Sequence, residues 1–457
     1  MERRYEARKE ELLAGCRVKP EVLDGMTERL QTFVQPFAKL LGDSQRQQHA
    51  RTYVVGLLSN LKRKNTESIA YFHDQDRQGL QRFIGWVPWA YEPLLQELTR
   101  QVGQELGEPD GVIVFDPSGF AKKGTESVGV QRQWIGRFGK IDNGQVGVYM
   151  GYVSRREQAL VDMRLFLPKE WASDKKRRKK SGVPKQVRFQ TRHQLALSML
   201  SERGSQLPHT WVAGDDEMGR SSSFRRDLRS LQERYLLAVP SNTLVRDLDV
   251  APPPYQGRGQ PRQTPFARAD QWRAALPEKI WQRIDVRDGD KGALTMDIVK
   301  VRVAAKMGGR CTGPEEILVV TRTKDEAGNV KHDYYLSNAP AETTLAEFAR
   351  VANAEHRIEE CIKRAKSEAG LAHYEVRTWR GWHHHQTLSL LATWFLVQET
   401  QRGKKIRSRV DCSTSSLELG DVALPGNGLR QTATHRGRLH PTSPTQRTCS
   451  VLSLQNT

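Results

Sequence analysis

The sequence predicts an α/β protein with a mixed sheet and flanking helices, preceded by a helical N-terminal region. Two patterns carry this prediction. Over residues 20–108 the apolar residues recur three and four positions apart, which is helical spacing. From residue 111 onward, short apolar runs alternate with helical segments in the order three strands, helix, strand, helix, strand. That order is typical of an α/β protein with a mixed sheet.

The helical N-terminal region, residues 1–108, contains three amphipathic segments. Leu30 and Phe37 mark the first segment, residues 53–61 form the second, and residues 91–106 form the third. Basic and polar residues fill the positions between the apolar ones. Both a DNA-binding module and a plain helical cap on the next domain fit this pattern.

The expected α/β core is divided into two parts, residues 109–250 and residues 341–402. Its expected strands are 112–115, 146–153, 160–167, 210–213 and 235–239, and its expected helices in the first part are 195–200 and 224–231. Between the two parts, residues 251–340 are predicted to be a β-rich insertion that begins with a Pro- and Gly-rich linker. No period survives in residues 403–457, which indicates either disorder or a frameshifted or truncated gene end.

Charge and composition favour a polyanionic partner. Lys and Arg outnumber Asp and Glu by 72 to 53, a formal charge of +19, and neutralising phosphates releases condensed counterions. A merely soluble basic protein or a membrane-binding one is the alternative. The charged start has no apolar signal core after it, no apolar stretch is long enough to span a membrane, and the five cysteines contain no CxxC pair. These features predict a cytoplasmic protein in a reducing compartment.

Two expected strands each end in an aspartate, Asp116 after residues 112–115 and Asp215 after residues 210–213. In open α/β sheets, ligands and catalytic groups gather at the carboxyl ends of the strands. Two carboxylates there, with a third from a nearby helix, suit a pair of Mg²⁺ ions, which prefer oxygen ligands and assist phosphodiester displacement. The alternative is that each aspartate only caps the turn or helix that follows it.

The third carboxylate is expected from a late helix that contains Glu359. Glu359 and Lys366 are seven residues apart and therefore lie on one helical face, two turns from each other. A glutamate that faces the sheet, with a lysine beside it, could bind metal and contact the DNA backbone. An ordinary surface ladder of Glu and Lys is the alternative.

Several segments of the sequence resemble the bacterial insertion-sequence DDE transposases, in the branch described as DDE superfamily endonucleases. The resemblance runs from about residue 25 to 400. The segments that carry it are Asp116-Pro-Ser-Gly-Phe-Ala-Lys-Lys-Gly, residues 127–136 and 139–148, Leu165-Phe-Leu-Pro-Lys-Glu-Trp, Gly182-Val-Pro, Gly214-Asp-Asp-Glu-Met-Gly, Tyr335-Leu-Ser-Asn, Tyr374-Glu-Val-Arg and Gly381-Trp-His-His-His.

The resemblance implies a ribonuclease-H-like fold whose three acidic residues bind two Mg²⁺ ions, for which Mn²⁺ can substitute. Asp116 is then the first acid, and Asp215 is the second because it stands four residues before Gly219, with Asp216 as the fallback. Glu359 is the third acid, and together the three would be both the catalytic and the metal-binding residues.

Related transposases carry a Tyr-x2-Arg-x3-Glu-x6-Lys signature around the third acid, and this chain matches half of it. Glu359 and Lys366 occupy the last two places, while Glu355 stands at the arginine place and Ala352 at the tyrosine place. Glu360 and Glu368 therefore remain alternatives to Glu359.

The implied function is metal-dependent DNA cleavage and strand transfer at the terminal inverted repeats of an insertion sequence. The expected partner is double-stranded DNA, held by a homo-oligomer in a synaptic complex in the bacterial cytoplasm at the nucleoid. The expected DNA-backbone contacts are Lys122, Lys123, Arg177, Arg178 and Lys366. A catalytically inactive or domesticated DNA-binding protein of the same fold, and a nuclease without strand transfer, are the alternatives.

Three further sequence features have simpler interpretations than a metal site, a targeting signal or a base-stacking platform. Consecutive histidines do not converge on one ion in a helix, so residues 383–385 are not expected to bind metal. The basic run 175–180 is interpreted as a DNA-gripping loop rather than a nuclear-localisation stretch. Trp86, Trp89 and Trp134 are expected in the core.

Overall fold

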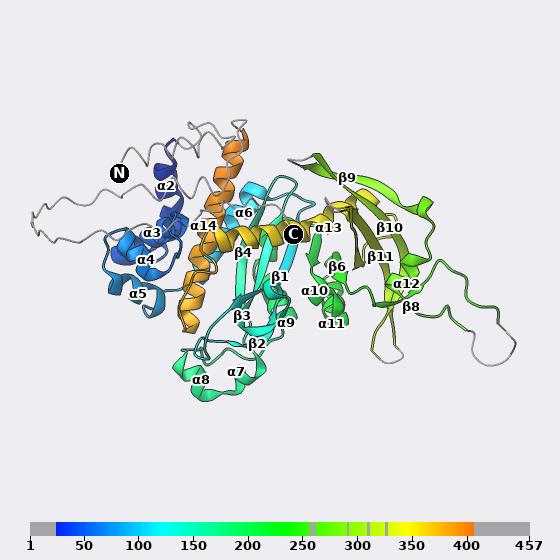
Figure 1. Cartoon of the computed structure of the whole chain (residues 1–457), viewed down its shortest axis with the longest axis horizontal. Helices are drawn as coiled ribbons and strands as arrows, with labels where there is room; N and C mark the ends of the chain where they lie inside the picture. Colours follow the sequence, from blue (N-terminus) through cyan, green and yellow to red (C-terminus); the bar gives the residue numbers. More distant parts are fainter. Residues whose placement is uncertain are drawn as a thin grey trace, which may run out of the picture. The chain divides into compact units, whose positions relative to one another are not determined.

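The computed structural model describes residues 24–405, apart from 256, 258–261, 290–291, 309–310 and 325–327. The described chain begins with five helices (Figure 1), which are α2 (Met26–Lys39), α3 (Ser44–Leu58), α4 (Thr66–Phe72), α5 (Arg77–Gly85) and α6 (Glu92–Leu106). Asp43, Asn65 and Asp76 cap α3, α4 and α5 by accepting hydrogen bonds from backbone N–H groups of the first turn. The predicted tail lies outside the described residues from 406 onward.

The five strands nearest the candidate site form a mixed sheet. They are β1 (Val112–Ala121), β3 (Lys140–Val153), β4 (Gln158–Leu165), β5 (Trp211–Gly214) and β6 (Tyr235–Val239). Their order is β4-β3-β1-β5-β6, with β1, β5 and β6 parallel and β3 antiparallel to its neighbours. This is the strand order of a ribonuclease-H-like core, and it confirms the mixed α/β fold predicted from the sequence.

Helices cover the faces of this sheet. They are α9 (Arg192–Arg203), α10 (Asp216–Arg220), α11 (Ser222–Ser230), α13 (Leu345–Ser367) and α14 (Trp379–Lys405). The long helix α13 packs on β1, β4 and β5 through a buried stripe that includes Ile358, Ile362 and Ala365. A Cβ atom at Gly151 of β3 would lie 2.4 Å from the Ile358 side chain, so the glycine allows α13 to approach the sheet closely.

The predicted β-rich insertion continues the same sheet. Its elements, with β7 just before it, are β7 (Leu244–Asp247), β8 (Ala267–Arg268), α12 (Ala269–Ala274), β9 (Gln282–Gly289), β10 (Gly292–Lys306), β11 (Thr312–Lys324) and β12 (Val330–Ser337). β12 pairs antiparallel with β6, and the described strands form one twelve-stranded sheet. The domain boundaries proposed from the sequence stay predictions, and this continuous sheet crosses the one between residues 250 and 251.

A hairpin and two short helices extend from one end of the core (Figure 1). β2 (Gln131–Ile135) pairs with the start of β3, and α7 (Lys169–Ser173) and α8 (Lys175–Lys180) follow β4. Short 3-10 turns span Gly136–Phe138, Gly204–Gln206 and Glu278–Ile280. The basic run was expected to be a loop, but it forms α8, because Asp174 caps it by accepting a hydrogen bond from the backbone N–H of Arg177. Among the described residues, no helix is both long and apolar enough to cross a bilayer.

Candidate active site

Asp116 lies in the middle of β1, where the strand passes from buried to partly buried residues. Residues alternate between the faces of a strand, so Asp116 shares a face with Ser118. The Ser118 hydroxyl accepts a hydrogen bond of 2.8 Å from Lys366 Nζ of α13, which identifies that face as the one covered by α13. Burial, and next the charge of Glu359, raises the pKa of Asp116 to about 6.

Asp215 follows β5, the parallel neighbour of β1, and Gly214 lies directly beside Phe115 in the ladder. The Asp215 carboxylate caps α10 by accepting a hydrogen bond of 3.0 Å from the backbone N–H of Met218. The capping role considered as the alternative is therefore present. Burial and the charge of Asp116 nevertheless raise the pKa of Asp215 to about 8, so the two carboxylates act on each other.

Asp216, the fallback for the second acid, points elsewhere. Its side chain is 54% exposed and pairs with Arg220 at 2.8 Å on the surface of α10. The neighbouring Glu217 is closer to the site and contributes to the pKa of both Asp116 and Asp215. Arg192 of α9 compensates the Glu217 charge through an ion pair of 2.5 Å.

Glu359 lies on α13 with its side chain 75% exposed, and it pairs with His356 at 3.8 Å. This pairing lowers the pKa of Glu359 and, together with Glu360, raises that of His356 to about 9. Glu359 is also the charge that acts most strongly on Asp116. The structure therefore brings the motif glutamate within electrostatic range of the first acid, although its side chain is turned largely to solvent.

Glu355 is a carboxylate that the sequence interpretation did not assign to the site. It lies one turn before Glu359 on α13 and is partly buried, and burial followed by the charges of Asp215 and Asp116 raises its pKa to about 8. The signal was visible in the sequence, because an acid at the arginine place of the signature falls on the same helical face as Glu359. Glu360, by contrast, pairs with His356, and Glu368 lies at the C-terminal end of α13 near Lys64.

The donor set fits a divalent cation by its chemistry. Asp116, Asp215, Glu355 and Glu359 supply only hard oxygen donors, and they repel one another at the place where β1, β5 and α13 meet. Within the described ranges, no group of three or more His, Cys, Asp or Glu side chains is already arranged around a single point. Closure of these carboxylates on a cation would therefore require side-chain rotation, which the exposure of Glu359 permits.

The lysines expected to contact DNA differ in their availability. Lys366 donates to Ser118 and lies over the Phe120 ring, beside the acids. Lys122 donates to the backbone carbonyl of Tyr374 at 2.9 Å and lies 3.3 Å from the centre of its ring, and burial lowers the pKa of this lysine to about 7. Lys123 is exposed. The Lys122 side chain is thus turned inward, and Lys123 is the more accessible neighbour.

The two arginines of α8 are also held by the protein. Arg177 lies 3.8 Å from the Trp171 ring and donates to Thr125 O, and Arg178 donates to the carbonyls of Pro184 and Val187 at 2.9 Å each. The lysines of the same helix are exposed instead.

The three consecutive histidines are buried in α14, and each has a partner within the protein. His383 bonds to the carbonyl of Trp379, His384 to those of Ile84 and Trp89, and His385 to the Tyr53 hydroxyl and the carbonyl of Gly370. Burial lowers their pKa values to about 3, 4 and 3. They join α14 to the N-terminal helices.

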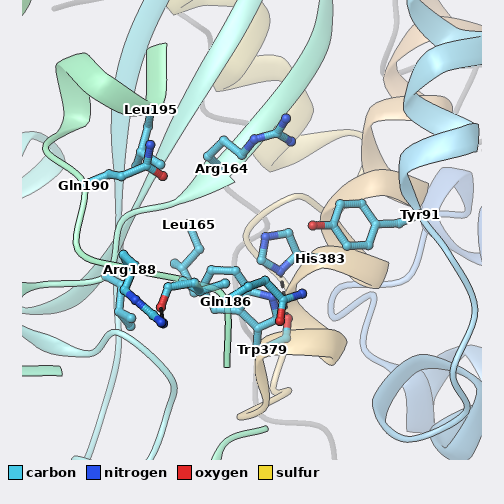
Figure 2. A pocket seen from close by; sticks show the side chains of 11 residues that line it. Tyr91, Arg164, Leu165, Gln186, Arg188, Gln190, Leu195, Trp379 and His383 are labelled. Atoms are coloured by element: carbon cyan, nitrogen blue, oxygen red, sulfur yellow. Dashed lines mark hydrogen bonds between the residues drawn. The ribbon is translucent and has the colours of Figure 1, made fainter. Parts of the chain in front are cut away.

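A pocket of about 480 Å³ is lined by His383 of this cluster (Figure 2). Tyr91 and Trp379 flank the His383 ring at centroid distances of 4.7 and 4.4 Å, and Arg164 lines the pocket as well. Arg164 is neutralised by Asp162 and Glu202. None of Asp116, Asp215, Glu355 and Glu359 lines this pocket, so it is not the candidate active site.

The tryptophans correct one expectation. Trp89 is buried as predicted, at 7% exposure, but Trp86 and Trp134 are 69% and 58% exposed. Trp86 stands at the C-cap of α5, after its last buried residues, and Trp134 lies on the face of β2 opposite the buried Gln133 and Ile135.

Comparisons with known proteins assign the chain to a family. The family model described as "DDE superfamily endonuclease" matches residues 36–293, more than half of the chain. The chain therefore belongs to the DDE superfamily endonuclease family, which confirms the resemblance noted in the sequence. Membership of this family implies dependence on a divalent metal ion.

Two individual proteins are similar to the chain. The probable transposase for insertion sequence element IS701 of Microchaete diplosiphon is 30% identical over 199 residues, which is 42% of this chain and 49% of the relative. The chain thus matches about half the length of that relative. The piggyBac transposase, in a cryo-EM structure of its synaptic complex with hairpin DNA, is similar with a TM-score of 0.41 and 9% identity, over 87% of this chain and 77% of that one.

Proposed function

We propose that the chain is a transposase that cleaves DNA at the ends of its own insertion sequence and joins the freed ends to a target. The observation that carries this proposal is the meeting of Asp116, Asp215 and the α13 glutamates beside Lys366, in a chain of the DDE endonuclease family. The half-length match to an insertion-sequence transposase supports the strand-transfer step.

The proposed ligands of two Mg²⁺ ions are Asp116, Asp215 and Glu359. When bound, such a pair stabilises the charge that develops on the phosphate during in-line displacement. Asp116 and Asp215 are held by β1 and β5, so their backbones are fixed before DNA arrives. Glu359 lies on the exposed turn of α13 and supplies the third carboxylate from the solvent side.

Glu355 is proposed to assist the three metal ligands without binding the metal itself. Its partly buried carboxyl is within electrostatic range of Asp215 and Asp116, and its raised pKa keeps it protonated near neutral pH, where it could donate a hydrogen bond to a neighbouring carboxylate. Lys366 is proposed to contact the DNA backbone beside the site. Lys123 and the α8 segment would bind backbone phosphates further away.

The remaining parts of the proposal concern the assembly. Double-stranded DNA would be the partner, bound by a homo-oligomer that holds both element ends, and the protein would act at the nucleoid in the bacterial cytoplasm. The N-terminal helices, up to residue 108, would add DNA contacts. A catalytically inactive DNA-binding protein of the same fold is the competing function, favoured by the departures from the signature at Glu355 and Ala352.

The test is cleavage of an end-labelled duplex that carries one terminus of the element, in Mg²⁺. We expect Asp116→Asn and Glu359→Gln each to reduce cleavage at least about 100-fold, because each removes a proposed ligand of the metal ions that stabilise the transition state. Asp216→Asn is the matched control and should retain the wild-type rate, because that carboxylate is exposed and paired with Arg220.

The same assay separates the alternatives. Binding without cleavage by the wild-type chain would favour the inactive DNA-binding protein, and cleavage without joining would favour a plain nuclease. If Glu355→Gln abolishes cleavage while Glu359→Gln leaves it intact, Glu355 is the third metal ligand and the assignment of Glu359 is wrong.

A further inference from the structure

The β2–β3 hairpin exposes large apolar side chains at its tip. Trp134, Phe138 and Ile141 are 58%, 45% and 57% exposed. Trp134 and Ile141 are directly paired in the antiparallel ladder, so they lie side by side on one face. The opposite face of β2 carries the buried Gln133 and Ile135. The core is thus completed by one face of the hairpin, and the other face presents an apolar patch, which is typical of a contact surface.

The lysines of α8 belong to a segment that is attached to the start of the same hairpin. Lys175, Lys176, Lys179 and Lys180 are exposed, and Lys176 and Lys180 are one helical turn apart. The segment that contains α7 and α8 is fixed to the start of the hairpin, because Trp171 Nε1 donates to Val130 O at 2.8 Å.

Two polar contacts reinforce this attachment. Gln131 Nε2 of β2 donates to the Glu170 carboxylate of α7 at 3.1 Å, and Lys180 pairs with Glu126 in the loop before the hairpin. The apolar tip and the lysine face therefore belong to one structural unit, which we call the hairpin arm, made of residues 131–141 and 169–180.

The strand register sets an upper limit on the distance between the tip of the hairpin arm and Asp116. Asp116 pairs with Tyr149 of β3, and Trp134 pairs with Ile141 of the same strand, eight residues away. A strand rises about 3.3 Å per residue, so the tip lies at most about 26 Å from Asp116 along β3. Duplex DNA rises about 3.4 Å per base pair, so this distance corresponds to about eight base pairs.

We propose that the hairpin arm is a second DNA-binding surface, which contacts the duplex within about eight base pairs of the scissile phosphate. The lysines of α8 would bind backbone phosphates, and Trp134, Phe138 and Ile141 would lie against sugars and base edges in a groove, as apolar side chains on two-stranded ribbons can. This inference rests on the proposed function, because it measures the contact from a phosphate held by Asp116 and Asp215.

Charge complementarity favours DNA as the partner of this surface. Four exposed lysines lie on α8, in the segment attached to the start of the hairpin, and the whole chain carries a formal charge of +19. A second copy of the chain would bring the same excess of positive charge to the patch, whereas a phosphate backbone neutralises it and releases counterions. The apolar tip adds contact area without charge, so it should contribute affinity that does not depend on salt.

The test is the dissociation constant for a fluorescein-labelled 30-base-pair duplex that carries one element terminus, measured by anisotropy at several salt concentrations in EDTA. We expect Trp134→Ala/Ile141→Ala to weaken binding about tenfold with an unchanged salt slope. We expect Lys176→Ala/Lys179→Ala to lower the slope of log K against log salt by about 1.8, or about 0.9 for each phosphate contact.

Matched controls come from exposed residues elsewhere in the chain. Leu231→Ala and Lys279→Ala/Lys324→Ala should leave both affinity and slope unchanged, since these side chains are exposed but lie outside the hairpin arm. Thermal melting of each variant checks that it is folded.

The outcomes are separable. Unchanged binding by the hairpin and lysine variants, with normal binding by the wild-type chain, overturns the hairpin arm and leaves the proposed function standing. A change in self-association instead of DNA affinity also overturns it, because the apolar tip would then bind another copy of the chain. Failure of the wild-type chain to bind the duplex overturns the proposed function itself.

Discussion

At the scale of single residues, the candidate active site is defined by carboxylates that destabilise one another. Asp116 lies in β1, Asp215 directly follows β5, and Glu355 is a partly buried residue of α13. Their pKa values of about 6, 8 and 8 are raised first by burial and then by neighbouring negative charges. A folded protein keeps such a cluster when something outside the chain compensates it, and a cation does so directly.

This repulsion predicts how stability depends on pH. The folded chain holds the Glu355 proton up to about pH 8, whereas the unfolded chain releases it near the ordinary pKa of 4.5. The folded state therefore binds more protons between these values, and stability must fall as pH rises through this window. Glu355→Gln has no proton to lose, so it should escape this loss.

We therefore expect Glu355→Gln to raise the melting temperature by at least about 2 °C at pH 8 in EDTA, and to leave it almost unchanged at pH 5. Differential scanning fluorimetry of both proteins across this range measures the effect. Glu342→Gln, at an exposed glutamate outside the site, is the control and should show no such pH dependence. A destabilised Glu355→Gln at pH 8 would mean that the carboxylate is held by favourable partners.

Part of the site could be read from residue types alone. The strand-end positions of Asp116 and Asp215 follow from short apolar runs, and the structure places both aspartates beside each other as that pattern implies. The burial of Glu355 could not be read in the same way, because helical spacing puts Glu355 and Glu359 on one face without saying which is nearer the sheet. The inward turn of Lys122 depends on Tyr374, which is 252 residues away.

At the scale of elements, strands with clear apolar runs were predicted and those without them were not. The runs at 112–115, 146–153 and 235–239 match β1, β3 and β6. The sequence did not predict β2, because Trp134 and Ile135 are the only apolar residues among its five. A half-buried strand of this composition shows little periodic pattern. The sequence did not predict the α8 helix, because its six basic residues repel one another. The Asp174 cap stabilises the helix at its N-terminus.

The connection between the core and its β-rich extension gives an element-scale prediction. Glu316 of β11 is 2% exposed, and its carboxylate accepts hydrogen bonds from Arg225 of α11 at 2.9 Å and from the Tyr235 hydroxyl of β6 at 2.6 Å. Glu316→Ala would leave the Arg225 charge buried without this partner. We expect a loss of about 3–5 kcal/mol in the free energy of unfolding, measured by urea denaturation.

Its neighbour Glu315 is the matched control. The Glu315 side chain is 51% exposed and pairs with Arg302 on the surface. Glu315→Ala should leave the urea midpoint unchanged within error, because exposed pairs contribute little. Equal effects from the two substitutions would show that the buried contact does not join α11 to the extension as described.

At the scale of the whole molecule, two electrostatic effects oppose each other. The chain carries a formal charge of +19, which attracts DNA from a distance, yet the phosphate to be cleaved must approach a cluster of carboxylates. A divalent cation at the cluster reverses the local field without altering the long-range one. Metal should therefore control how closely DNA binds as well as whether it is cut.

This balance gives a prediction for binding in the absence of cleavage. Without metal and at a pH above about 8, where both carboxyl groups are ionised, Asp116→Asn/Asp215→Asn should bind a non-cleavable phosphorothioate duplex more tightly than the wild-type chain. The reason is that two charges that repel the phosphates are removed; asparagine at position 215 still caps α10. Adding Mg²⁺ at constant ionic strength should tighten binding by the wild-type chain severalfold and leave the double variant unaffected. Anisotropy titrations with Asp216→Asn as the control measure both effects. An Mg²⁺ response that is the same in all three proteins would place the ion elsewhere, since only the loss of the strand-end carboxylates can remove a site built from them.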